Sequence, residues 1–145
     1  AEACGRVGEI DEGFLVLEEA FAVVKRNDER IWEGELYRRK GELTLRKLSV
    51  LLLHPPSPNT QHSTLGTQAE KEAEAYFLKA IDIARQQHAK SFELRAMISL
   101  SRMWQRQHKV VEARRMLAEV YGWFTERCET ADLQEAKALL EALYG

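Results

Sequence analysis

Cysteine is scarce in this chain of 145 residues, and long apolar runs and an excess of charge of one sign are missing. Its two cysteines, Cys4 and Cys128, are too few and too scattered for a disulfide framework, which favours a reducing, cytoplasmic setting. The apolar run VLLL at 50–53 is far shorter than the roughly 20 residues that cross a bilayer. We therefore expect neither a disulfide-rich domain nor a membrane protein, and we expect no signal peptide.

The formal net charge of −2 argues against two classes of partner, nucleic acids and membrane surfaces. Enzyme signatures are missing as well, because the sequence has no phosphate-binding glycine loop, no H-E-x-x-H and no C-x-x-C. Two glycines in GRVGEI, Gly5 and Gly8, lack the lysine and preceding strand of a nucleotide loop, and we interpret Gly8 as a turn between helices. We expect no catalytic residue, no metal and no cofactor.

Helical signal fills most of the chain, and no alternation of apolar and polar residues indicates a strand. The sequence predicts an all-α fold of about seven helices. Their expected ranges are up to residue 7, 10–27, 30–52, 68–88, 91–107, 110–127 and 131–144.

Three segments share one pattern, in which a small residue is followed by apolar residues at +4, +7, +8 and +11. The small residues are Gly13, Ala73 and Ala113, separated by 60 and then 40 residues. The helices before the second and third segments carry their own small residues, Gly41 and Ser101. Each unit is therefore predicted to be a helical hairpin whose helices cross where their side chains are small.

The extra residues in the longer spacing fall within 49–67, where all three prolines lie and where charged residues are absent. We interpret this range as an insertion in the turn of the middle hairpin, with Thr67 and Glu70 forming a capping box at the start of the next helix. Two readings of the insertion stay open. It is either a loosely packed extension of the turn, or an arm that embraces a partner or a second copy of the chain.

The segment AEAYFLKA, with Ala73, Phe77 and Ala80, resembles helix B of tetratricopeptide repeats. The segments around Gly13 and Ala113 resemble it more loosely. The resemblance implies a single domain over 1–145, arranged as a right-handed superhelical stack (an α-solenoid) of antiparallel helix hairpins. Its parts would be a partial repeat at 1–28, a repeat at 29–89, a repeat at 90–129 and a capping helix at 131–144.

More narrowly, VYGWFTERCETADLQEAKALLEAL and KAIDIARQQHAKSFELRAMISLSRMWQ resemble the C-terminal repeat region of bacterial multidomain signalling proteins. In these proteins a cyclase or DNA-binding output domain is joined to an ATPase and then to helical repeats. The resemblance implies a non-catalytic scaffold for protein–protein interaction within a larger regulatory protein. The chain, whose first residues are already in helical phase, is expected to be a piece of that protein.

In such a stack, residues beside the packing stripe of each first helix line a concave groove. The candidate groove residues are Glu35, Arg38, Glu42, Arg46, Arg95, Ile98, Arg102, Gln105 and Arg106. Five of them are arginines, which bind carboxylates well, so an acidic peptide or protein surface is the expected partner. The opposing interpretation is a solvated face that Glu35 and Glu42 partly neutralise.

Two other functions stay open, a homodimerisation module and a small-ligand sensor that uses the concave face. Among the four histidines, His54 and His62 are interpreted as solvated residues of the insertion rather than metal ligands. The other two, His88 and His108, fall at expected helix ends. Cys4 is expected to be a small core residue, and no nucleophile role is assigned to Cys128.

Overall fold

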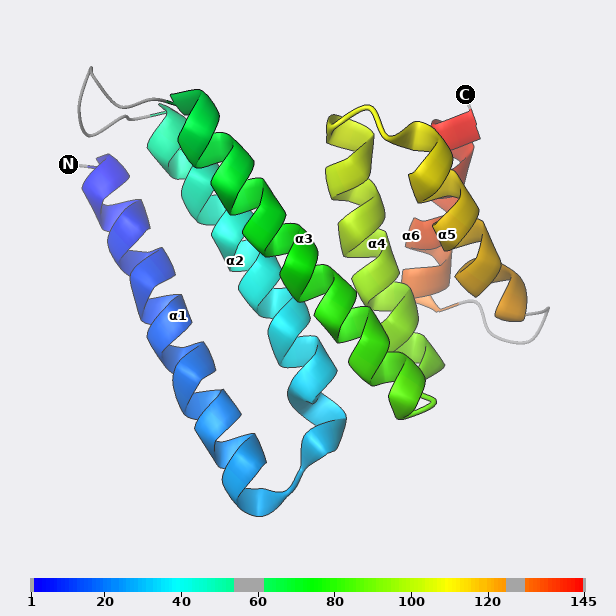
Figure 1. Cartoon of the computed structure of the whole chain (residues 1–145), viewed down its shortest axis with the longest axis horizontal. Helices are drawn as coiled ribbons and strands as arrows, with labels where there is room; N and C mark the ends of the chain where they lie inside the picture. Colours follow the sequence, from blue (N-terminus) through cyan, green and yellow to red (C-terminus); the bar gives the residue numbers. More distant parts are fainter. Residues whose placement is uncertain (1, 54–61, 125–129, 145) are drawn as a thin grey trace. The chain divides into compact units, whose positions relative to one another are not determined.

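The computed structural model describes residues 2–53, 62–124 and 130–144, and all regular structure within these ranges is helical. Six α-helices and one short 3₁₀ helix follow one another along this part of the chain (Figure 1). The prediction of an all-α fold is therefore confirmed for these ranges. The chain divides into two compact units, Ala1–Tyr76 and Phe77–Gly145. Whether the two units form the single domain expected over 1–145 depends on how they associate, so the single domain stays a prediction.

The first unit is built around α1 (Glu2–Asn27), the 3₁₀ helix η1 (Arg30–Trp32) and α2 (Glu33–Leu53). Ile10, Leu17 and Val24 recur every seven residues along α1 and are buried, so one stripe of this helix forms the core. Figure 1 shows α1 and α2 running side by side in opposite directions, and the two helices pack together along their length.

Two ion pairs between α1 and α2 fix how the helices align. Lys40 Nζ lies 2.7 Å from Glu18 Oε1, and Lys47 Nζ lies 2.7 Å from Asp11 Oδ1. The close approach between the helices falls at Gly13, where an added Cβ would lie 3.2 Å from Leu43 Cδ1. The small residue that the repeat pattern marked in this helix therefore lies at a helix–helix contact.

The second unit contains the end of α3 (His62–Gln86), followed by α4 (Lys90–Arg106), α5 (Val110–Trp123) and α6 (Ala131–Tyr144). The last three helices pack against one another in all three pairs. Ser101 of α4 and Ala113 of α5 are fully buried, and the Ser101 hydroxyl donates to the Ala113 carbonyl across 3.5 Å. The predicted crossing of small residues is confirmed for this hairpin.

Three helices end in the same way, with a residue in the left-handed conformation. Asp28, His88 and His108 have φ of 56°, 54° and 62°. The amide after each donates to the carbonyl five residues earlier, as in Glu29 to Val24 at 3.1 Å. This bond closes a Schellman motif, which satisfies a terminal carbonyl of the helix. The prediction that both histidines lie at helix ends is confirmed.

The predicted turn at Gly8 is wrong. α1 runs from Glu2 to Asn27 without a break, so the two helices expected up to residue 7 and at 10–27 are one. A glycine inside a helix costs only about 1 kcal/mol relative to alanine, which a long packed helix offsets. The chain therefore has six α-helices, rather than about seven, within the described ranges.

The predicted helix start at Thr67 is also wrong, because α3 already begins at His62. At the other end of the predicted insertion, α2 continues to Leu53. Both edges of 49–67 are therefore helical, and the remaining residues 54–61 lie outside the described ranges. The end of the helix expected at 110–127 also lies outside the described ranges, and α5 is described as far as Trp123. The helix expected at 131–144 has the predicted bounds.

Candidate functional site

The nine candidate groove residues fall in both units. Four lie on α2 in the first unit and five on α4 in the second. Among the arginines, three pair with carboxylates of the same chain. The other two, Arg46 and Arg106, are exposed and form no ion pair with a side chain that the structure describes.

On α2, Arg38 is enclosed by two acidic neighbours. Its Nη2 lies 2.5 Å from Glu35 Oε1 and its Nε lies 2.9 Å from Glu35 Oε2, which is a bidentate pair. Its Nη1 also donates to Glu42 Oε1 across 2.7 Å. The hydrogen bonding with Glu35 raises the pKa of Arg38, against the opposing effect of burial. On α2, therefore, Glu35 and Glu42 neutralise Arg38, as the opposing interpretation of the candidate groove expected.

A hollow of about 430 Å³ lies beside this cluster, between α1 and α2. We call it the α1–α2 groove. Its lining residues are Gly13, Val16, Leu17, Arg39, Glu42, Leu43 and Arg46. Two of these, Glu42 and Arg46, are candidate residues from the sequence. Arg39 was not among the candidates, although it shares one helix face with Arg46 through their seven-residue spacing.

On α4, two of the predicted arginines reach across to the last helix. Arg95 Nε donates to Asp132 Oδ2 across 2.8 Å, and Arg102 Nη2 donates to Glu135 Oε1. Helix α6 therefore covers this part of the predicted basic strip with its own acidic residues. These partners lie 37 and 33 residues away along the chain. Local spacing alone did not identify them.

The remaining α4 candidates differ in exposure. Ile98 is 3% exposed and belongs to the core, so the prediction that it faces a groove is wrong. Burial follows from its position on an α4 in which most residues from Leu94 to Trp104 are buried. Gln105 is half-buried, and Arg106 is exposed at the end of the helix.

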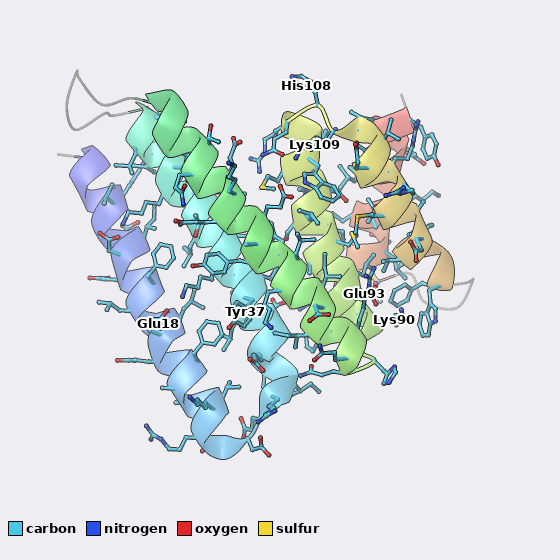
Figure 2. All side chains as sticks on the ribbon, viewed as in Figure 1. Glu18, Tyr37, Lys90, Glu93, His108 and Lys109 are labelled. Atoms are coloured by element: carbon cyan, nitrogen blue, oxygen red, sulfur yellow. The ribbon has the colours of Figure 1, made fainter. Side chains whose placement is uncertain are left out.

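A buried carboxylate at the start of α4 was not among the candidates. The side chain of Glu93 is 2% exposed, and its two oxygens accept from Arg85 Nε at 2.7 Å and Lys90 Nζ at 2.9 Å. Lys90 Nζ also lies 5.7 Å from the centre of the Trp123 ring. Figure 2 shows Lys90 and Glu93 on the same end of α4. In the sequence Glu33 and Glu93 are 60 residues apart, which is the longer of the two repeat spacings, but this spacing does not indicate burial.

A second missed cluster surrounds Lys40 in the first unit. Besides its ion pair with Glu18, Lys40 Nζ lies 5.7 Å from the Phe21 ring centre and 5.3 Å from that of Tyr76. Tyr37 contacts both rings, with centroid distances of 4.9 Å and 6.4 Å. The hydrogen bond with Glu18 raises the pKa of Lys40. Figure 2 shows Glu18 on α1 and Tyr37 on α2, and Tyr76 belongs to α3.

Within the described part of the chain, no three side chains of the metal-binding types lie together. Both His54 and Cys128 lie outside the described residues, and the side chains of Cys4 and His62 do as well. Their predicted roles stay predictions. None of the helices in the described ranges combines the length and the apolar character of a membrane span.

Comparisons of the chain with protein-family models, curated proteins and solved structures give no match. The resemblance to tetratricopeptide repeats therefore rests on the residue pattern alone.

Proposed function

We propose that this chain is a non-catalytic protein–protein interaction module. It would belong to a larger cytoplasmic signalling protein of the bacterial kind that its sequence resembles, with its hairpins stacked as in tetratricopeptide repeats. The consecutive packing of α1 with α2 and of α4 with α5 and α6 supports a stack of hairpins.

The observation that carries the proposal is the α1–α2 groove, whose floor is apolar and whose rim is charged. Val16, Leu17 and Leu43 offer apolar contact, and Arg39 and Arg46 offer guanidinium groups beside it. Apolar area surrounded by polar side chains is the usual composition of a protein-binding surface. Arginine is also enriched at such surfaces because it combines a long apolar stem with a forked donor group.

A second candidate function, a small-ligand sensor, is favoured by the volume of the same groove. About 430 Å³ lies within the range of small-molecule sites. A third, homodimerisation, is favoured by apolar residues of α1 that face solvent, since Leu15 and Val16 are 67% and 62% exposed.

Thermal unfolding of the chain separates these functions. We expect helical peptides to raise the midpoint temperature in a saturable way and a panel of small metabolites to leave it unchanged, because a ligand stabilises the state that it binds. Light scattering of the chain alone should give the mass of a monomer. Stabilisation by metabolites alone would replace the interaction function with the sensor, and a stable dimer without peptide would replace it with self-association.

A further inference from the structure

The α1–α2 groove has two exposed arginines on one side of an apolar floor, together with Glu42, whose carboxylate is paired with Arg38. Arg39 and Arg46 are seven residues apart on α2, so they lie on one face, two turns or about 10 Å apart along the axis. Between them Leu43 lines the groove, and on α1 the floor continues through Val16 and Leu17. Val16 is 62% exposed, so the floor is open to a partner.

Arg39 has only a long ion pair, with Glu35, and Arg46 has none with a described side chain. The side chain of Arg39 is 63% exposed, and its Nε lies 3.6 Å from Glu35 Oε1, beyond hydrogen-bond distance. Both oxygens of Glu35 already accept from Arg38. Arg46 forms no ion pair with any side chain in the described ranges. Both guanidinium groups are therefore available to carboxylates from another chain.

The second unit has the same arginine spacing with its acidic partner in place. Arg95 and Arg102 are also seven residues apart on one helix, and they bind Asp132 and Glu135 of α6. The apolar stripe of α6, which includes Leu133, Ala136 and Leu140, is buried beside these pairs. An acidic amphipathic helix is therefore a ligand that this pattern of side chains already accepts.

We propose that the α1–α2 groove binds an acidic amphipathic helix of a partner protein, with two carboxylates on Arg39 and Arg46 and an apolar stripe on Val16, Leu17 and Leu43. The inference rests on the proposed interaction function and specifies the chemistry of the partner. Charge complementarity selects the acidic helix, and the apolar floor selects an amphipathic one. A second copy of the chain is a poorer occupant, because its own acidic helix, α6, is already engaged on α4.

A fluorescent peptide with the sequence of residues 130–144 is a suitable probe, because it carries the acidic and apolar pattern of α6. Its binding to the whole chain is measured by fluorescence anisotropy. We expect saturable binding that weakens by roughly tenfold or more in the double variant Arg39→Glu, Arg46→Glu. The matched control is Lys25→Glu, Lys71→Glu, which removes the same charge from exposed positions outside the groove and should change the affinity less than about twofold.

Two further measurements identify the site. The peptide could instead displace α6 from α4, in which case Arg95→Glu, Arg102→Glu would weaken binding and the groove variant would not. That result overturns the inference. Circular dichroism and thermal unfolding of each variant confirm that it is folded, so that loss of binding reports the groove.

Two altered peptides separate failure of this inference from failure of the interaction function. One carries Asp132→Asn and Glu135→Gln, and the other carries Asp132→Lys and Glu135→Lys. We expect the acidic peptide to bind at least tenfold more tightly than either. Equal or stronger binding of the altered peptides leaves the interaction function standing and overturns the acidic partner. If none of the three binds, the proposed partner helix is wrong. If the chain instead forms a dimer that Arg39→Glu, Arg46→Glu dissolves, the groove belongs to a second copy and the inference is also overturned.

Discussion

Glu93 is the most enclosed charged side chain in the described part of the chain, and its two cationic partners make that burial possible. A buried carboxylate without partners loses its hydration and is strongly unfavourable. Arg85 approaches one oxygen and Lys90 the other, and the two cations remain 47% and 32% exposed. The Glu93 carboxylate and its two cationic partners therefore join the end of α3 to the start of α4 across their short connection.

Replacing Glu93 with glutamine is expected to lower the free energy of unfolding by about 2 kcal/mol, since hydrogen bonds to charged groups contribute about 1.5–3 kcal/mol. The amide keeps the shape of the side chain but removes its charge and one of its two acceptor oxygens. Urea denaturation measures the change. Glu119→Gln on the exposed face of α5 is the control and should change stability by less than about 0.5 kcal/mol. Equal effects at the two positions would contradict the assigned role.

Lys40 presents a second case, in which a cation is held by one carboxylate and two aromatic rings. Lys40→Met keeps the apolar stem and removes the charge, and we expect it to cost about 1 kcal/mol. Because the pKa of Lys40 is raised above its ordinary value of 10.5, the folded chain holds this proton more tightly than the unfolded chain. The stability that the charged Lys40 contributes is therefore complete below pH 10.5, and it is lost as the pH rises through the higher pKa of the folded state.

The stability difference between the Lys40→Met variant and the original chain should be the same near neutral pH and at about pH 9, and smaller at about pH 11. Urea denaturation at the three pH values measures the difference. A difference that stays constant throughout would assign the effect to packing rather than to charge.

At the residue scale the sequence predicted the partners of arginines that lie nearby on the same helix, but not the partners that lie on another helix. Arg38 lies within four residues of Glu35 and Glu42, so its neutralisation followed from helical spacing. Asp132 and Glu135 reach Arg95 and Arg102 only because α6 folds back onto α4. Such contacts depend on tertiary packing, which residue spacing does not contain.

At the scale of the helices, α1 differs most from its prediction. Gly8 lies inside this helix, and beyond its chain neighbours and the adjacent backbone of the helix no described atom lies within 4 Å of where its Cβ would be. Alanine therefore fits there without a clash. It also reduces the backbone entropy lost on folding.

Gly8→Ala should raise the free energy of unfolding by about 0.5–1 kcal/mol, as measured by urea denaturation. Gly13→Ala is the comparison within the same helix. Its Cβ would meet Leu43 at 3.2 Å, so we expect a smaller gain or a loss. A loss of stability in Gly8→Ala would indicate the turn that the sequence first suggested, because alanine is disfavoured where φ is positive.

The contrast between α1 and α6 explains which helix ends the sequence could predict. The range 131–144 was correct because its apolar stripe begins directly after Thr130, whose hydroxyl accepts from the Leu133 amide across 3.3 Å. The capping pattern at Thr67 failed because serine or threonine followed by glutamate three residues later also occurs inside helices, and here α3 extends further back. A capping motif predicts a helix start only where the preceding residues cannot be helical.

For the whole molecule, net charge and local charge lead to opposite expectations. The chain carries 21 basic and 23 acidic residues, so its overall charge of −2 would repel an acidic ligand weakly. The α1–α2 groove nevertheless presents two exposed guanidinium groups within about 10 Å of each other, and its one lining carboxylate, Glu42, is paired with Arg38. At that range the nearer charges dominate, because salt screens interactions beyond a Debye length of about 10 Å.

The association rate of the acidic peptide should therefore fall as ionic strength rises from about 50 mM to about 500 mM, as measured by stopped-flow fluorescence. In Arg39→Glu, Arg46→Glu the trend should reverse, because the groove then repels the peptide and salt screens that repulsion. The Lys25→Glu, Lys71→Glu variant has the same net charge and should keep the original trend. If both double variants behaved alike, the charge of the whole chain would control the encounter and the groove would have no role in steering. If the association rate of the original chain rose with salt, the groove would likewise have no role in steering. Attraction between the groove and the peptide predicts a rate that falls as salt rises.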